Sequence, residues 1–365
     1  MASRALIGAL AVAAGACAGS LPSYREPGAL PEPSLREPPA LRVAVVGDFG
    51  DPGCRQRRVA RALLRWNERR PFGLVLQPGD NVYNCGPNPR LSGAEGCRFS
   101  DDGATVAPGF EAPADPLFER NEGALRGLFG RGGEPVPIFL ALGNHDVGEP
   151  WFCNVRRMAR DEWMRRRACL EVARRSPGWR MPGRHYVLDE GPVRLIVVDS
   201  NVADADYAGF TLAEEVRFVK EASPGCDTLR CFLVAHHPPA LAVTRSPPTT
   251  QAPWLARMRE LVAAGEGRLA GVLAGHAHAL EHLALDEVDV LIAGSSSRGR
   301  RHDLSAAWPP GARLRFASSA AGFGVLEAWD GGWALRLVDA RGRSLHCCEA
   351  LGRQRCRPVA CRGDP

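Results

Sequence analysis

The chain has 365 residues, of which 45% are hydrophobic and 24% are charged. This composition excludes fibrous and wholly disordered proteins, and the length allows one large α/β domain or two ordinary ones. The formal charge of +5 is small for this length, so it indicates neither a nucleic acid nor an anionic membrane surface as the main partner.

The N-terminus is typical of a secretory signal, which we place at residues 1–20. An apolar run of small residues over 5–16 follows Arg4 and is too short to span a bilayer. Two processing routes stay open: cleavage after Ala16, or cleavage before Cys17 with lipidation of its thiol, as in bacterial lipoproteins. Either route predicts an exported chain, periplasmic or extracellular, that touches a membrane only through a lipid on Cys17.

The rest of the chain divides into three predicted segments: a proline-rich linker at 21–40, a main domain at 41–340 and a cysteine-rich tail at 341–365. Short apolar runs in the main domain are separated by helical patterns, which predicts an α/β layered domain. The expected strands are 41–46, 74–76, 136–142, 195–198, 231–235, 269–274 and 288–293, followed by a hairpin over 324–338. The expected helices are 55–70, 116–129, 156–174, 212–221 and 254–264.

Two stretches of the main domain, 84–115 and 148–183, fit no regular element. The first is rich in Gly, Pro and Cys, and the second contains several Trp and Arg. Because each follows one of the motifs described below, both are candidate walls of a substrate cleft. They are equally consistent with ordinary surface insertions, and both interpretations stay open.

The sequence contains 12 cysteines, which predict disulfides in an exported chain because the thiols meet an oxidising compartment. Pairing of near neighbours gives Cys85 with Cys97, Cys153 with Cys169, Cys226 with Cys231, and pairing within the tail group of Cys347, Cys348, Cys356 and Cys361. If Cys17 is removed or lipidated, one thiol is left over, and we expect it to be Cys54. Alternatively, the tail cysteines could form a four-thiolate zinc site with His346 in reserve, although their spacing is not of the paired C-x2-C type.

Polar side chains follow the ends of the apolar runs. In chain order these side chains are Asp48, Asp80, Asn144, His145, Asp146, His236, His276 and His278. Each alone is consistent with an ordinary turn, but ligands of open α/β sheets lie beyond the carboxyl ends of the strands, so the whole set is expected to converge. Carboxylate, amide and imidazole donors without a thiolate suit iron, zinc or manganese. The pattern therefore predicts a metal site.

Five short motifs contain these residues and occur in a fixed order: Gly47-Asp48-Phe49-Gly50, Gly79-Asp80-Asn81-Val82-Tyr83, Gly143-Asn144-His145-Asp146, His236-His237-Pro238 and Gly275-His276-Ala277-His278. In this order they resemble the calcineurin-like metallophosphoesterases, and within that family the purple and tartrate-resistant acid phosphatases. The resemblance extends over 47–278, most of the main domain. It implies a four-layer α-β-β-α sandwich in which two mixed sheets pack face to face with helices outside.

The resemblance also implies a ligand set for two metal ions. One ion would be bound by Asp48, Tyr83 and His278, the second by Asn144, His236 and His276, and Asp80 would bridge the two. The His-x-Pro spacing favours His236 over His237 as the ligand. Many members have Asp-x-His at the first motif, whereas here Gly50 takes the third place and Tyr83 is present, which is the purple-phosphatase pattern. Because a phenolate is a hard anionic donor, the resemblance implies Fe(III) partnered by Fe(II), Zn(II) or Mn(II).

Two cations in one site can bind a phosphoryl oxygen, supply a hydroxide and neutralise charge in an in-line displacement. His145 is expected to donate a proton to the leaving group or to stabilise the equatorial oxygens, with Asp146 orienting its ring; the alternative for His145 is a structural role. Glu281 and His282 resemble the corresponding end of plant-type members and could line the pocket. Arginines in nearby loops could clamp phosphate, although most are expected to be solvated: Arg90, Arg98, Arg298, Arg300 and Arg301.

These expectations together predict an exported phosphomonoesterase that acts on a small phosphate ester, with no nucleic-acid partner. A phosphodiesterase or nucleotidase is the first alternative, because the same centre serves those reactions. A catalytically silent surface lipoprotein that uses the scaffold for binding is the second. The complete ligand set argues against the second alternative, since a silent relative would be expected to have lost at least one ligand.

Overall fold

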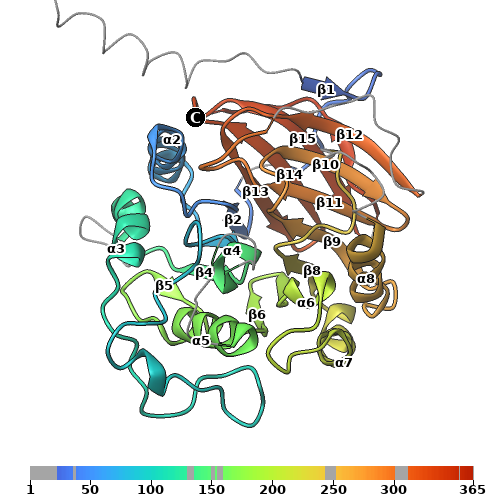
Figure 1. Ribbon diagram of the computed structural model, residues 1–365. Coiled ribbons are helices and arrows are strands. Elements are labelled where there is room, and N and C mark those ends of the chain that lie inside the picture. Colours follow the sequence, from blue (N-terminus) through green and yellow to red (C-terminus); the bar gives the residue numbers. More distant parts are fainter. Residues whose placement is uncertain are drawn as a thin grey trace, which may run out of the picture.

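The computed structural model describes residues 23–35, 38–129, 135–148, 153, 159–242, 252–300, 311–352 and 354–364. Within them, two eight-stranded β-sheets pack face to face and helices cover the outer faces (Figure 1). This arrangement confirms the expected α/β sandwich of two mixed sheets. The signal expected at 1–20, with Cys17, lies outside the described residues. No described helix is both long enough and apolar enough to cross a membrane.

Each sheet combines parallel and antiparallel strands. The first sheet has the order β16 (Arg357–Val359), β15 (Ser344–Leu351), β14 (Gly332–Asp339), β13 (Gly322–Trp329), β2 (Leu41–Val45), β3 (Leu74–Pro78), β4 (Ile138–Ala141) and β5 (Trp179–Arg180). The second has the order β1 (Ser23–Arg25), β12 (Ala312–Ser318), β10 (Leu280–Leu285), β11 (Val288–Ala293), β9 (Leu269–Ala274), β8 (Arg230–Ala235), β7 (Val193–Val197) and β6 (Tyr186–Glu190). The parallel strands are β2 to β5 in the first sheet and β7, β8, β9 and β11 in the second.

Strand residues alternate between two hydrophobic layers. In β2, Val43 and Val45 belong to the layer between the sheets, whereas Ala44 belongs to the layer beneath the helices. In β8, Phe232 and Leu233 divide in the same way. Because both faces of these strands are buried, they appear in the sequence as continuous apolar runs, and every run expected to be a strand forms one.

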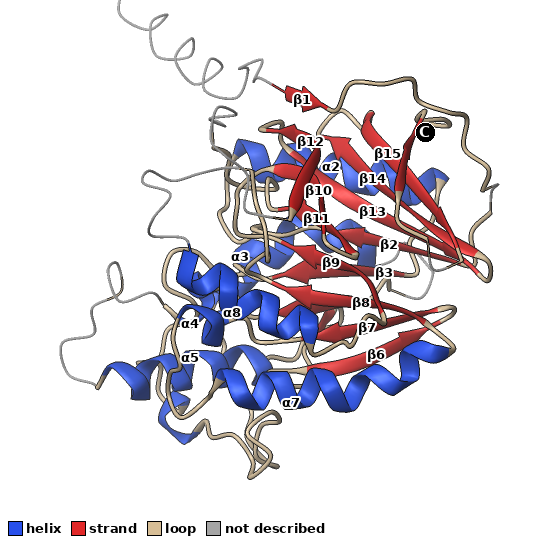
Figure 2. Cartoon of the chain, turned by 90° about the vertical axis from the view of Figure 1, so that its right-hand side faces the viewer, coloured by secondary structure: helices blue, strands red, loops and turns tan. Residues whose placement is uncertain are grey.

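Helices cover both outer faces of the sandwich (Figure 2). The first sheet is covered by α2 (Cys54–Arg69), α3 (Pro116–Glu122), η2 (Gly123–Phe129) and α5 (Arg160–Ala173), and the second by α6 (Asn201–Asp204), α7 (Leu212–Ala222) and α8 (Ala252–Ala263). α2 buries Val59, Leu63 and Trp66 on one face, at the spacing of an amphipathic helix. The expected helices are confirmed, except that the start of the one expected at 156–174 lies outside the described residues.

Sequence analysis missed β6, β10 and β12 because none of them is a purely apolar run. β6 lies at a sheet edge and alternates buried with more exposed residues, while β10 buries the polar Glu281 and His282. The hairpin expected over 324–338 is confirmed as β13 and β14.

The C-terminal segment, expected at 341–365 to be a tail, contributes β15 and β16 to the first sheet. Two disulfides, Cys347–Cys361 and Cys348–Cys356, join β15 to the last part of this same segment. The zinc site considered for these cysteines is therefore wrong, because each of the four thiols is bonded to another. The expectation that they pair among themselves is confirmed.

Two other disulfides correct the near-neighbour pairing. Cys85 bonds to Cys153 and Cys97 to Cys169, so the predicted pairs Cys85–Cys97 and Cys153–Cys169 are wrong. The reason is that the two irregular stretches do not each fold on themselves: the disulfides link 84–115 to 148–183. Cys54 is also disulfide-bonded in the full chain. The prediction that it is left over applies to a chain that has lost Cys17 or carries a lipid on it, and it stays a prediction.

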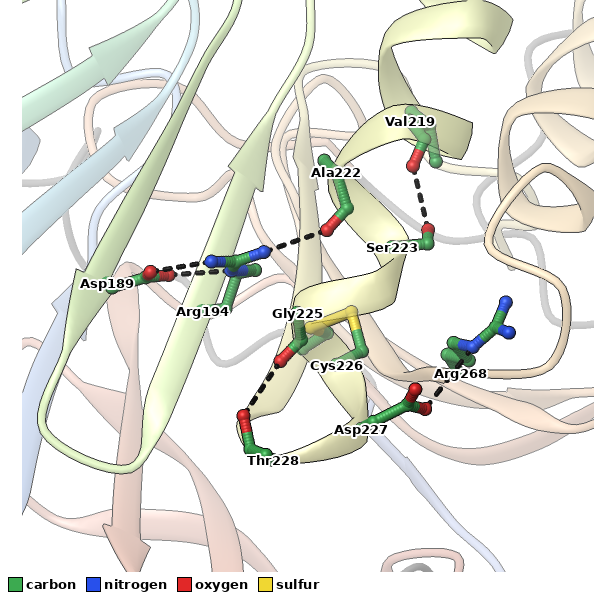
Figure 3. Close-up of a disulfide and its surroundings, with 11 residues drawn as sticks. Asp189, Arg194, Val219, Ala222, Ser223, Gly225, Cys226, Asp227, Thr228 and Arg268 are labelled. Carbon is green, nitrogen blue, oxygen red and sulfur yellow. Dashed lines mark hydrogen bonds and ion pairs between the residues drawn. A yellow bond between two sulfur atoms is a disulfide. The ribbon is translucent and has the colours of Figure 1, made fainter.

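Cys226–Cys231 confirms the remaining predicted pair, and Figure 3 shows it at the turn between α7 and β8. η3 (Ser223–Asp227) continues α7 into this turn. Arg194 donates to the carbonyl of Ala222 at 2.9 Å and packs so closely that a Cβ at Gly225 would lie 1.7 Å from its Nη1. The turn therefore anchors the amino end of β8, whereas His236 follows the carboxyl end.

Candidate metal centre

All seven ligands expected from the resemblance follow the carboxyl ends of parallel strands. Asp48 follows β2, Asp80 and Tyr83 follow β3, Asn144 begins α4 (Asn144–Val147) after β4, His236 follows β8, and His276 and His278 follow β9. β2, β3 and β4 belong to the first sheet and β8 and β9 to the second. The residues therefore reach the centre from both sheets.

The backbone at four of these positions is strained. Asp48, Asp80, His276 and His278 have φ angles of 56°, 56°, 68° and 53°, and they are four of the seven non-glycine residues with positive φ among the described residues. The left-handed region costs an L-residue roughly 1–2 kcal/mol, so it persists only where the surroundings impose it. The left-handed conformation at these four positions indicates that the direction of the side chain is important at each of them.

Close backbone approach explains two of the motif glycines. A Cβ at Gly143 would lie 2.3 Å from Oδ1 of Asp80, and a Cβ at Gly50 would lie 2.4 Å from the carbonyl oxygen of Asn81. The turns after β2, β3 and β4 therefore pack directly on one another. No side chain at position 50 could supply a metal ligand, in keeping with the use of Tyr83 instead.

The first donor group consists of Asp48, Tyr83 and His278. The phenol of Tyr83 donates to Oδ1 of Asp48 at 2.9 Å and lies 3.0 Å from Nε2 of His278. The same Nε2 lies 3.2 Å from Oδ1 of Asp48. One carboxylate oxygen, one phenol oxygen and one imidazole nitrogen thus point at a common position.

The second donor group consists of Asn144, His236 and His276. Nε2 of His236 lies 3.0 Å from Oδ1 of Asn144 and 3.2 Å from Nδ1 of His276. On the other side of the same ring, Nδ1 of His236 lies 3.0 Å from the carbonyl of Pro78, which can accept its proton and leave Nε2 as the donor atom. Nδ1 of His237 lies 3.0 Å from Oγ of Ser200, and His237 also offers a ring nitrogen within 4.8 Å of donor atoms of His236 and His276.

Asp80 lies between the two groups. Its Oδ1 is 3.3 Å from Nε2 of His236. Asp48, Asp80 and His236 each offer a ligand atom within 4.8 Å of the other two. Burial opposes ionisation of Asp80, but His236 and His145 outweigh it and lower its pKa to about 2. An ionised carboxylate with two oxygens is the donor that a bridge between two ions requires.

The donor set fits two metal ions. Asp48 and Asp80 are almost fully buried, and among the described residues their ion pairs are with His278 and His236. Buried carboxylates this close together are unfavourable without a cation. Burial, then Asp48 and Asp80, raise the pKa of Tyr83 well above its ordinary value, so a phenolate at this position requires a bound cation.

His145 and Asp146 follow Asn144 in α4. The backbone N–H of His145 donates to Oδ1 of Asp80 at 3.0 Å, and its Nδ1 lies 2.6 Å from the carbonyl of Asn84. The carboxylate of Asp146 accepts hydrogen bonds from the backbone N–H groups of Gly143, Asn81 and Val82 at 2.7, 2.8 and 2.9 Å. These bonds make Asp146 a brace between the turns that carry Asp80 and Asn144.

Other residues expected near the pocket lie elsewhere. His282 is buried against His346 of the other sheet, with 2.8 Å between its Nδ1 and Nε2 of His346, and Glu281 accepts a hydrogen bond from Ala242. Arg90 and Arg98 are exposed. Arg301 lies outside the described residues.

The loop at 294–300, after β11, is a part of the site that sequence analysis gave no role beyond its arginines. The N–H of Ser297 donates to the carbonyl of Asp48 at 3.1 Å, and the N–H of Arg300 donates to the carbonyl of His278 at 3.2 Å. Glu171 of α5, buried beneath Asn81, was also missed, since one Glu in a charged helix gives no signal. The run of small residues at Gly294-Ser295-Ser296-Ser297 after a strand was the available signal for the loop.

No protein-family model matches the chain, and no curated protein matches it. Solved structures do match. The chain is similar to GAP50, the anchor in the inner membrane complex of Plasmodium, with a TM-score of 0.63 and 16% identity over 86% of this chain and 90% of that one. It is similar to the purple acid phosphatase PPD1 from yellow lupin (Lupinus luteus) seeds, with a TM-score of 0.58 and 12% identity over 89% and 58% of the two chains.

PhoD is a third similar structure, with a TM-score of 0.52 and 13% identity over 92% of this chain and 74% of that one. At such identities a match establishes architecture and leaves activity to be argued from the site. The two mixed sheets and their outer helices agree with these matches. The chain therefore has the calcineurin-like metallophosphoesterase fold.

Proposed function

We propose that this protein is an exported phosphoester hydrolase with a dinuclear metal centre, acting on small phosphate monoesters. The observation that carries the proposal is the meeting of two donor groups at one carboxylate, Asp80. Its Oδ1 is 3.3 Å from Nε2 of His236 in the second group, and Asp48 of the first group, Asp80 and His236 each offer a ligand atom within 4.8 Å of the other two.

Each donor group would hold one ion. The phenol oxygen of Tyr83, a hard donor, suits Fe(III) at the first position, and the second position suits Fe(II), Zn(II) or Mn(II). When bound, the ions would supply Lewis acidity and a nucleophilic hydroxide. The neutral amide of Asn144 is a ligand that adds no charge to repel an anionic substrate.

His145 is the proposed proton donor to the leaving oxygen, or a stabiliser of the equatorial oxygens. With Nδ1–H directed to the carbonyl of Asn84, Nε2 is the ring nitrogen proposed to face the substrate. The proposed role of Asp146 is to accept hydrogen bonds from backbone N–H groups and so to hold together the turns that carry Asn144 and Asp80. The sequence suggested a different role, in which Asp146 orients the His145 ring.

Asp80→Asn tests the proposal directly. The amide cannot serve as an anionic bridge, so hydrolysis of a chromogenic phosphate monoester should fall below detection and metal content should drop from two ions per chain. The matched control is Asp330→Asn, an exposed carboxylate in the turn between β13 and β14, which should behave as the parent protein. Full activity in Asp80→Asn would contradict a dinuclear centre.

Two alternatives use the same fold. A phosphodiesterase or nucleotidase would need no change in the donor set, so a panel of mono- and diesters decides between them. The similarity to GAP50, whose description is that of an anchor, favours a binding scaffold as the second candidate. Metal-free protein without activity on any ester would support the scaffold, whereas the complete donor set supports catalysis.

Export is supported by the disulfides, which persist in oxidising compartments. We propose a periplasmic or extracellular location. Mass spectrometry of the mature N-terminal peptide would distinguish cleavage after Ala16 from lipidation of Cys17, and a retained N-terminus would contradict both.

A further inference from the structure

Arg298 lies against the first donor group. Its Cζ is 3.8 Å from the centroid of the Tyr83 ring. Its Nε donates to Oδ2 of Asp51 at 2.8 Å, and its Nη2 donates to Oδ1 of Asn84. The side chain nevertheless stays 27% exposed. The guanidinium is thus fixed between a predicted ligand and solvent.

The loop that carries Arg298 is bonded to the centre on both sides of that residue. Ser297 N–H donates to the carbonyl of Asp48, and Arg300 N–H donates to the carbonyl of His278. Arg298 itself covers Tyr83. The loop therefore contacts every residue of the first donor group, and its backbone holds Arg298 beside that group.

The hydrogen-bonding capacity of Arg298 is only partly used. A guanidinium has five N–H groups, of which one is directed to Asp51 and one to Asn84. The other three have no acceptor among the described residues. Arginine is well suited to phosphate because its planar fork can bind two oxygens at once.

We infer that Arg298 is a specificity-determining residue of the proposed reaction: it binds phosphoryl oxygens beside the first metal position and favours monoesters over diesters. The inference rests on the proposed function, since it assigns a substrate group to the same centre. A monoester carries close to two negative charges at neutral pH and a diester carries one, so a fixed cation discriminates between them.

The test compares Arg298→Gln and Arg298→Lys with the parent protein. Arg298→Gln should weaken the binding of inorganic phosphate, measured by calorimetry, by about tenfold or more. It should raise KM for a monoester more than KM for a diester, while metal content stays at two ions per chain. Arg298→Lys keeps the charge without the fork and should lie between the two. Arg57→Gln, an exposed arginine in the first turn of α2, is the control.

Three results would overturn the inference: phosphate affinity equal to that of Arg57→Gln, equal losses for monoester and diester, or loss of a metal ion from Arg298→Gln. The last would assign Arg298 to the support of Tyr83 instead of substrate. A different result would identify failure of the proposed function: the parent protein itself would lack metal ions and hydrolyse neither ester.

Discussion

The two donor groups differ in charge. The first combines the carboxylate of Asp48 and the phenol oxygen of Tyr83 with one imidazole, whereas the second offers two imidazoles and the neutral amide of Asn144. Hard anionic oxygens suit a highly charged ion, and neutral nitrogen and amide donors suit a divalent one. This difference in charge supports the proposed pairing of a trivalent ion in the first group with a divalent ion in the second.

The surroundings of the two groups differ as well. The first is held by the backbone of the 294–300 loop and covered by Arg298. The second is lined by rings: His237 lies 4.5 Å from His276 between centroids, and Trp254 lies 5.7 Å from His276. We expect substitutions in the first group to alter the electronic properties of the centre, and substitutions in the second to decide whether the divalent ion is held.

Within the two donor groups, His236→Ala should have the largest effect. Nε2 of His236 contacts Asn144, His276 and Asp80, so its loss should empty the second position and lower the hydrolysis rate by about a thousandfold or more. Metal content should fall from two ions to one while the visible absorbance of the iron form remains. His185→Gln, a histidine stacked on Phe218, is the control. Loss of the absorbance together with the second ion would break the distinction between the groups.

Tyr83→Phe should give the opposite pattern. Without the phenolate, the iron form should lose its visible charge-transfer band, while both ions are retained and turnover falls by about 10- to 100-fold. Tyr186→Phe provides a matched control, because this buried phenol donates to the carbonyl of Leu140. A parent protein that contains iron but has no visible band would contradict the ligand role of Tyr83.

Much of the fold could be predicted from the sequence because the central strands are buried on both faces. Runs such as 231–235 and 269–274 leave no polar residue to confuse the pattern, and β8 and β9 form there. β10 was missed because it buries Glu281 and His282, which are satisfied by partners from distant parts of the chain. No local pattern reports such partners.

The predicted ligands could be placed at strand ends because each motif directly follows an apolar run. Parallel strands have their carboxyl ends at the same edge of the sheet, so the turns that follow them lie together. The disulfides could not be predicted in the same way. Near-neighbour pairing assumes that a loop closes on itself, whereas Cys85 and Cys153 meet only because two loops 68 residues apart lie together. Arg298 was one of several candidate arginines until its contact with Tyr83 distinguished it.

The buried brace between the two donor groups gives the smallest expected effect. The side-chain amide of Asn81 donates to Asp146 at 3.0 Å and to Glu171 at 3.3 Å. Burial, and then Asp146, raise the pKa of Glu171 well above its ordinary value, which favours its protonated form. Glu171→Gln keeps a neutral side chain of the same shape and should change the free energy of unfolding by less than about 1 kcal/mol, whereas Glu171→Ala should lose about 1–3 kcal/mol.

The pH dependence of the free energy of unfolding distinguishes a protonated Glu171 from a side chain that only fills space. A carboxyl group whose pKa is raised by folding binds a proton in the folded state that the unfolded chain has released, so its contribution to stability falls as pH rises above the ordinary value of 4.5. Glutamine cannot titrate, and Glu171→Gln should therefore lose less stability than the parent protein on moving from acid to neutral pH. Chemical denaturation of the metal-free protein at several pH values measures the difference, with the exposed Glu287→Gln as control. Curves for the parent and Glu171→Gln that stay parallel would show that folding does not raise the pKa of Glu171.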